Sequence, residues 1–72
     1  MTQQEKMEAL ALLFDEDVSA ITPETKLDDL IFDSVAKMSL IALLSEKFDK
    51  RIVAEDFKKL TAIQDILNLM HE

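Results

Sequence analysis

The sequence of 72 residues contains no cysteine and no glycine, and proline occurs once. Without cysteine the chain can form neither a disulfide nor a thiolate metal site, so its stability must come from helix packing alone. The lack of glycine and the single proline favour helices joined by short connections over collagen-like or disordered structure. Because a chain this short supports a single core, we expect one domain, residues 1–72, that buries only about 60% of the surface its unfolded chain exposes.

Residues typical of catalytic sites are scarce as well. The only histidine is His71, near the end of the sequence, where a solvated side chain is the simpler interpretation. With no cysteine and no central histidine, neither a Ser-His-Asp nor a Cys-His arrangement can be assembled. The adjacent carboxylates Asp28 and Asp29 are interpreted as solvated charge, because neighbouring side chains do not converge on one point by themselves. The sequence therefore predicts a protein that is not an enzyme and that has no metal site.

Uninterrupted apolar runs are far shorter than the roughly 20 residues that a membrane-spanning helix needs. The first residues, MTQQEKMEAL, lack the basic and apolar regions of a signal peptide. We therefore expect a cytoplasmic protein without stable membrane insertion.

The formal net charge is −7, from 15 acidic and 8 basic residues. Residues 1–33 hold nine acids and two bases, which gives −7, whereas residues 34–72 hold six of each and sum to zero. Nucleic acid is excluded as a partner because phosphate neutralisation requires a basic face. Basic protein partners should be steered towards the first half of the chain.

The first half predicts one helix followed by a long connection. Thr2 and Glu5 have the spacing of a capping box, and the apolar repeat that follows predicts a helix from Gln3 to Phe14. Residues 15–33 break this pattern with turn-forming side chains and the only proline, Pro23. Their apolar side chains predict a long ordered loop pinned to the core by Val18, Ile21, Leu27, Leu30 and Phe32.

The second half predicts a long helix and two shorter elements. The long helix runs from Ser34 to about Phe48, with an apolar repeat at Val35, Met38, Ile41, Ala42 and Phe48 and with exposed positions at Ala36, Lys37, Ser39, Ser45, Glu46 and Lys47. Residues 53–60 predict one or two short helical turns around Phe57. Thr61 and Gln64 form a second possible capping box, which opens a last helix through Ile63, Ile66, Leu67 and Met70. The fold class is therefore all-α, a small four-helix bundle of three longer helices and one short helix.

Ser34 stands where the acidic loop becomes the long helix, and its position has two interpretations. The hydroxyl can cap the helix, a role that both Asp33 and Ser34 fill well. It can instead carry a phosphate ester, since the free N–H groups and the positive dipole end of a helix stabilise that charge. The two interpretations are compatible if Asp33 caps the helix and Ser34 is modified.

Residues 21–67, ITPETKLDDLIFDSVAKMSLIALLSEKFDKRIVAEDFKKLTAIQDIL, resemble an acyl carrier protein. The features match in order: ITPETKL in the loop, Asp-Ser-aliphatic at the start of the second helix, a phenylalanine near its end, then AEDF and TAIQDI. The resemblance implies that 4′-phosphopantetheine is attached at Ser34 by a phosphopantetheinyl transferase, with coenzyme A as donor. The thiol of this arm would hold acyl groups as thioesters, and Asp33 would help to orient the transferase and its magnesium ion.

The resemblance also implies contact residues and partners. Acyl-transferring and ketosynthase-type enzymes would be partners of a monomeric carrier, with contacts at Asp28, Asp29, Val35, Lys37, Met38 and Glu46. The acyl chain would fold back beside the second helix into a space lined by Met38, Ile41, Ala42, Phe48, Ile52 and Ile63.

Two departures from the family leave alternatives open. Ile31 stands where family members commonly have glycine, and we interpret Ile31 and Phe32 as core residues. The resemblance implies a carrier for fatty acid, polyketide or a related specialised acyl pathway. The second helix has Glu46 as its only acid, which fits either free drift of surface charge or a specialised pathway instead of general fatty acid synthesis. A peptidyl or aminoacyl carrier using the same Ser34 arm is a further alternative. From another class, the chain could be a small acidic interaction module in which Ser34 only caps a helix.

Overall fold

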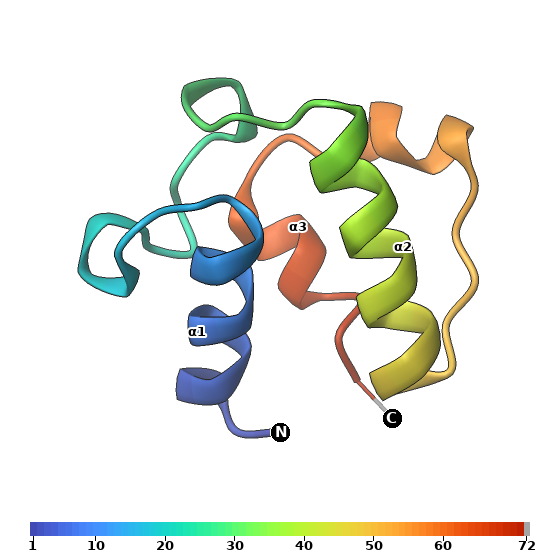
Figure 1. Cartoon of the computed structure of the whole chain (residues 1–72), viewed down its shortest axis with the longest axis horizontal. Helices are drawn as coiled ribbons and strands as arrows, with labels where there is room; N and C mark the ends of the chain where they lie inside the picture. Colours follow the sequence, from blue (N-terminus) through green and yellow to red (C-terminus); the bar gives the residue numbers. More distant parts are fainter. Residues whose placement is uncertain (72) are drawn as a thin grey trace.

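The computed structural model describes residues 1–71, and the α-helices of this part are α1 (Gln3–Leu13), α2 (Ser34–Phe48) and α3 (Ile63–Leu67). α1 and α2 stand on either side of α3 in the view of Figure 1. Three short 3-10 segments lie in the connections: η1 (Val18–Ala20), η2 (Leu27–Asp29) and η3 (Ala54–Lys59). Residues 1–71 form no strand, only an isolated antiparallel bridge between Lys26 and Ala62. The predicted all-α class is confirmed.

α1 begins as its sequence predicts. The Glu5 N–H donates to the Thr2 hydroxyl at 3.2 Å, and the Thr2 N–H donates to Glu5 Oε1 at 2.8 Å. These reciprocal bonds form the expected capping box. The bond from the Thr2 N–H, with a smaller contribution from the Thr2 hydroxyl, lowers the pKa of the Glu5 carboxyl. The helix ends at Leu13, and Phe14 follows as its buried C-cap residue.

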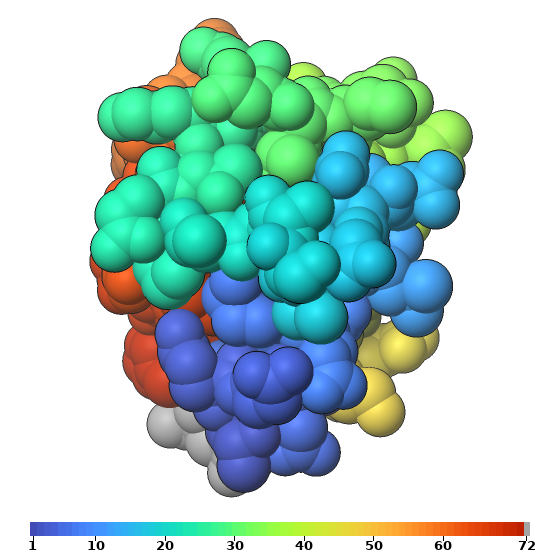
Figure 2. Space-filling model, turned by 90° about the vertical axis from the view of Figure 1, so that its left-hand side faces the viewer, coloured from blue at the N-terminus to red at the C-terminus, as the bar shows by residue number. Residues whose placement is uncertain are grey.

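The loop between α1 and α2 is ordered, as expected. Ile21 and Leu27 are buried, and Val18, Leu30 and Phe32 pack against the core. Backbone bonds also fasten the loop to the start of α3: Leu27 N–H to Thr61 O at 2.9 Å, Ile63 N–H to Thr25 O at 2.9 Å and Gln64 N–H to Pro23 O at 2.8 Å. Figure 2 shows the loop lying across one face of the molecule, above α1.

The bounds of α2 are confirmed, but its predicted buried face is right only in part, with Phe48 buried and Ile41 half-buried. Val35, Met38 and Ala42 are exposed, and the buried residues are Ala36, Leu40, Leu44 and Phe48, spaced four apart. Ala36 was expected on the surface. Since the run LIALL makes more than one side of the helix apolar, periodicity alone does not select the face that packs.

The last helix is shorter than predicted. α3 spans only five residues. Residues 1–71 therefore form two longer helices, α1 and α2, where three were predicted. After Leu67 the chain makes hydrogen bonds between residues three apart, as in a 3-10 turn: Leu69 N–H to Ile66 O and Met70 N–H to Leu67 O. Met70 lies beyond the end of the helix and is fully buried. The predicted Thr61–Gln64 box is also wrong, because Asp65 Oδ2 accepts from the Thr61 N–H, the Thr61 hydroxyl and the Ala62 N–H.

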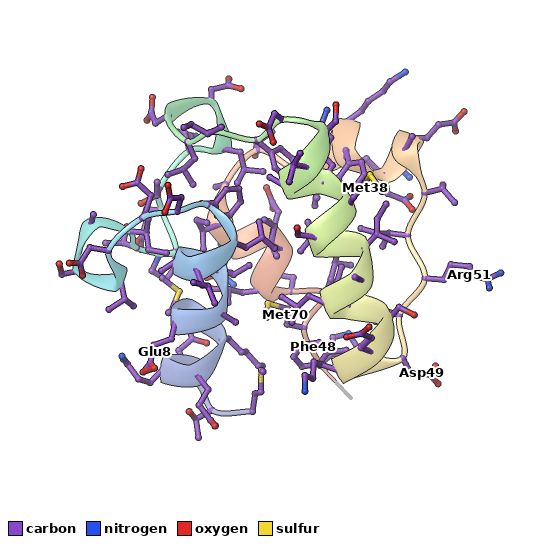
Figure 3. All side chains as sticks on the ribbon, in the orientation of Figure 1. Glu8, Met38, Phe48, Asp49, Arg51 and Met70 are labelled. Carbon is purple, nitrogen blue, oxygen red and sulfur yellow. The ribbon has the colours of Figure 1, made fainter. Side chains whose placement is uncertain are left out.

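The core joins all three α-helices. Its largest fully buried side chains are Leu10, Phe14, Leu40, Leu44, Ile63, Ile66 and Met70. Figure 3 shows Met70 and Phe48 near the lower end of α2, where both line one hollow. None of the helices within residues 1–71 is long and apolar enough to cross a membrane.

Candidate functional site

Ser34 is the first residue of α2, and its hydroxyl does not cap the helix. Asp33 is the N-cap residue, and its Oδ1 accepts a hydrogen bond from the Ala36 N–H at 3.0 Å. The Asp33 carbonyl accepts the first helical bond, from the Lys37 N–H at 2.9 Å. Ser34 itself is exposed to solvent. Asp33 therefore supplies the cap, and the Ser34 hydroxyl is left accessible for another role.

The electrostatics at this helix end suit an anionic ester on Ser34. The Asp33 carboxylate engages the Ala36 N–H, and the first turn of α2 after it holds no further acidic residue to oppose an anion at the positive end of the helix dipole. The free N–H groups of a first turn also face the position that a phosphate on its first residue would occupy. Lys37 follows one turn along the helix, with its ammonium over the Phe32 and Phe57 rings. An exposed hydroxyl at the N-terminus of a helix fits the attachment of a phosphodiester.

An aromatic cluster fixes the segment that leads into Ser34. The Phe32 ring lies 5.6 Å from the Phe14 ring and 5.6 Å from the Phe57 ring, measured between centroids. The Lys37 ammonium lies over two of these rings, 5.6 Å from the centroid of Phe32 and 5.8 Å from that of Phe57. Such contacts hold the lysine stem against the aromatic surface. The cluster thus joins the end of α1, the loop, α2 and η3, and it includes Phe32, two residues before Ser34.

Apolar side chains flank Ser34 on the surface. Ile31 is 65% exposed, Val35 72% and Met38 70%. The interpretation of Ile31 as a core residue is therefore wrong, whereas Phe32 is half-buried and packs on the core. The chain before the serine turns Phe32 inward into the aromatic cluster, which leaves Ile31 pointing to solvent. Ile31 and Val35 line a hollow of about 300 Å³ with Leu13, Phe14, Asp15, Asp33 and Ala36.

The other residues proposed as partner contacts form two groups, one of Asp28, Asp29 and Lys37 and the other of Glu46 alone. Asp28 and Asp29 are exposed in η2, and Glu46 is exposed in the last turns of α2. Lys37 is half-buried and, with Asp28, lines a hollow of about 460 Å³ between the loop and η3. Within the described residues 1–71, no group of three or more His, Cys, Asp or Glu side chains is placed to hold a metal ion.

The six residues expected around an acyl chain occupy different environments. Phe48, Ile52 and Ile63 are buried, and Ile41 is half-buried. Met38 and Ala42 are exposed on the surface of α2, and Figure 3 shows Met38 extending away from α1. A chain lying against all six would pass from this exposed pair into the packed core.

Sequence reasoning missed the contacts of Lys37 with the aromatic cluster. The chain has only four phenylalanines, and three of them form this cluster. Their spacing along the sequence carries no signal, since Phe32 and Phe57 meet only through the fold.

Comparison with known proteins agrees with this geometry. The family described as "Phosphopantetheine attachment site" matches residues 7–70 of the chain. An "Acyl carrier protein" of Exiguobacterium sp. (strain AT1b) is 41% identical over 61 residues, which cover 83% of this chain and 77% of that relative. No solved structure matches the chain significantly.

Proposed function

The chain belongs to the acyl carrier protein family, whose members bear covalently attached 4′-phosphopantetheine, and we propose that Ser34 carries this group. One observation carries the assignment: Asp33 makes the cap hydrogen bond, so the exposed Ser34 hydroxyl at the start of α2 is not needed to stabilise the helix. When bound, the group supplies a thiol that holds an acyl chain as a thioester.

The residues around Ser34 have distinct roles in this proposal. The Ser34 oxygen forms the bond to phosphorus and loses its proton, while the pyrophosphate bond of coenzyme A breaks and the nucleotide leaves. Asp33 uses Oδ1 for the cap, and Oδ2 is the oxygen that would face the transferase and its magnesium ion. The helix N-terminus and Lys37 would then offset the negative charge of the phosphodiester.

The biochemical role is delivery. A carrier does not perform the chemistry itself; it raises the effective concentration of a bound acyl group at each partner's active site. Val35 and Met38 would contact partner enzymes through their exposed apolar side chains, and Asp28, Asp29, Lys37 and Glu46 would add charged contacts. The acyl chain would enter beside Met38 and Ala42 and reach Ile41, Phe48, Ile52 and Ile63.

We further propose that the partners belong to a specialised acyl pathway. α2 exposes Glu46 as its only acid, together with Lys47 and the half-buried Lys37. Lysines on this helix would oppose basic docking patches, which excludes enzymes that expect an acidic helix. Acylation and elongation by general fatty acid synthase enzymes should therefore be poor and should improve in the double variant Lys37→Glu and Lys47→Glu. Efficient turnover that is equal in both forms would contradict the specialised role.

The attachment site is tested by intact-protein mass spectrometry after incubation with coenzyme A, magnesium and a broad-specificity phosphopantetheinyl transferase. We expect a gain of one phosphopantetheinyl group, lost in Ser34→Ala. Ser39→Ala is the matched control, because Ser39 is also exposed on α2 and its replacement should leave the modification intact. No mass gain, under conditions that modify a known carrier, would leave the chain as a small acidic interaction module.

A further inference from the structure

A hollow of about 360 Å³ lies between α1 and α2, and most of its lining is apolar. The residues that line it come from both helices: Ala9, Leu12, Leu13, Ser39 and Leu43. Two of them, Ala9 and Ser39, have short side chains, which leaves a gap between the helices. This feature is called the α1–α2 groove below.

The walls of the α1–α2 groove are apolar surface that the fold leaves open to water. Leu12 is 83% exposed, the largest exposed fraction among the large apolar side chains of residues 1–71. Leu13 and Leu43 are half-buried, because each also packs against the core. Apolar side chains laid between these leucines would remove that surface from water, which is the dominant favourable contribution to most protein association.

The groove lies on a different side of α2 from Met38 and Ser34. Met38 stands five residues before Leu43, which places it about 140° away around the helix. Figure 3 shows Met38 extending away from α1. Ser34 stands nine residues before Leu43, on about the opposite side of the helix and about 13 Å away along its axis. A molecule bound in the groove would therefore leave both residues accessible.

Acidic residues border the groove on both helices. Glu8 lies one turn before Leu12 on α1, and Glu46 lies one turn after Leu43 on α2; both acids are exposed. Figure 3 shows Glu8 on the side of α1 away from α2, so this carboxylate lies at an outer edge of the groove. Apolar walls with an acid at each edge are complementary to an apolar helix face flanked by cations.

The charge of the surrounding segments has the same sign. Residues 3–16 and 39–47 hold five acids against Lys6 and Lys47, which gives −3. The Lys6 ammonium lies over the Phe48 ring, 5.9 Å from its centroid, and this lysine lines a separate hollow with Phe48. The groove therefore attracts cations and repels anions.

We propose that the α1–α2 groove docks an amphipathic helix of another protein, with apolar side chains on one face and lysine or arginine on both flanks. Apolar side chains at positions i, i+3, i+4 and i+7 of that helix would lie between Leu12 and Leu43, and its cations would face Glu8 and Glu46. A second copy of the chain is disfavoured, because it would bring two acidic borders together and each copy has a net charge of −7. Such a helix would tether the protein by α1 while Ser34 stays accessible, which is a role beyond delivery and independent of the arm.

The test uses the full chain with Ser34→Ala, so that the result does not depend on modification of the serine, and a synthetic peptide. The peptide has about 16 residues, enough to form a helix, with leucines at the i, i+3, i+4 and i+7 spacing and lysines on both flanks. Titration followed by calorimetry and by amide chemical shifts should give saturable one-to-one binding, with the largest shifts at Ala9, Leu12 and Leu43.

Two control peptides separate the apolar from the charged contribution. A peptide of the same composition with its leucines spread around the helix should bind at least about tenfold more weakly, since it has no apolar face to bury. A peptide with glutamate in place of lysine should not bind. Equal affinity of the two lysine peptides would overturn the proposal, because charge alone would then explain binding.

Two exposed apolar residues provide matched variants. Leu12→Ala should weaken peptide binding by about tenfold, through loss of buried apolar area. Val53→Ala should leave binding unchanged, because Val53 stands just before η3, outside the groove. The two side chains are 83% and 56% exposed, so neither replacement threatens folding. An equal effect of the two variants, or chemical shifts centred on Met38, would overturn the proposal.

Two acids test the charged border in the same way. Glu8→Gln should weaken binding by about twofold to fivefold, as for an exposed ion pair, and added salt should reduce this difference. Glu24→Gln is the control, because Glu24 is exposed in the loop between α1 and α2. If both variants weaken binding equally, the peptide responds only to total charge and the proposal fails.

Two further results would assign the groove to another occupant and so overturn the proposal. A wild-type dimer in sedimentation that Leu12→Ala abolishes would mean that a second copy fills the groove. Binding of the protein to phosphatidylcholine vesicles that Leu12→Ala abolishes would mean that the groove meets a lipid surface.

Discussion

Asp33 and Ala36 are joined by a hydrogen bond of 3.0 Å from the Ala36 N–H to Asp33 Oδ1, and this bond closes the first turn of α2 directly over Ser34. The bond distinguishes the capping residue from its neighbour, which the sequence alone does not do. Asp33 stabilises the helix, and Ser34 is available for chemistry.

Replacing these two neighbours should therefore have unequal effects on stability. Asp33→Ala should lower the free energy of unfolding by about 1 kcal/mol, the usual cost of a lost N-cap. Ser34→Ala should change it by less than about 0.5 kcal/mol, as for an exposed residue without a structural role. Urea denaturation of both variants measures the difference. A larger loss for Ser34→Ala would mean that the serine caps the helix in solution.

Asp65 should make the stability of the protein depend on acid. Hydrogen bonds from the Thr61 N–H, the Thr61 hydroxyl and the Ala62 N–H hold the pKa of this carboxyl below its usual value of 3.8, and Lys26 adds a smaller effect. Because the pKa is lower in the folded state, the stabilisation is present above the unfolded pKa and is lost as the pH falls through the folded one.

Asp65→Asn should reduce the loss of stability between about pH 5 and pH 2, since the amide has no proton to gain. Urea denaturation at several pH values gives the comparison. Asp28→Asn is the control, because Asp28 is exposed in η2 and lies outside this hydrogen-bond network. An unchanged acid response of Asp65→Asn would show that the network does not persist in solution.

Both long helices are followed by an aspartate in the left-handed backbone region. Asp15 has φ 58° and Asp49 has φ 52°, positions where many proteins place glycine. The left-handed conformation costs a residue with a side chain roughly 1–2 kcal/mol, and glycine avoids that cost while losing about 0.5–1 kcal/mol of chain entropy.

Asp49→Gly should consequently stabilise the protein by about 0.5–1 kcal/mol, measured by thermal or urea unfolding. Lys50→Gly is the control, since its φ is not positive and glycine there should only destabilise. If both glycines destabilise, the end of α2 does not adopt this conformation in solution.

Local patterns allowed much of the fold to be predicted. Thr2 and Glu5 identify the start of α1 because a capping box involves only neighbouring residues. Asp33 and Ser34 identify the start of α2 for the same reason, and the motif they form locates the site. The cap of α3 was misassigned because the N-cap residue is Ala62 instead of Thr61, so that Asp65 and not Gln64 stands three residues after it and accepts from the Thr61 and Ala62 N–H groups.

Properties that depend on contacts distant in sequence were not predictable. The cluster of Phe14, Phe32 and Phe57, with Lys37 above it, requires three separate segments to meet. The outward orientation of Ile31 follows from that cluster, because Phe32 takes the inward position next to it. The buried face of α2 is likewise determined by packing partners that are distant in sequence, so its own sequence does not show which of its apolar faces is buried.

The orientation of α2 can be tested by replacing one residue of its buried face and one of its exposed face. Leu40 is fully buried, so Leu40→Ala should cost about 2–5 kcal/mol, from lost apolar burial and the cavity left behind. Met38 is 70% exposed, and Met38→Ala should change stability by less than about 0.5 kcal/mol. Thermal unfolding of the two variants distinguishes the faces even if Leu40→Ala does not fold, because Met38→Ala must then remain close to the wild type. A severe loss of stability for Met38→Ala would mean that Met38 is buried, as the apolar periodicity predicts. Met38 would then not belong to the surface proposed to meet partner enzymes.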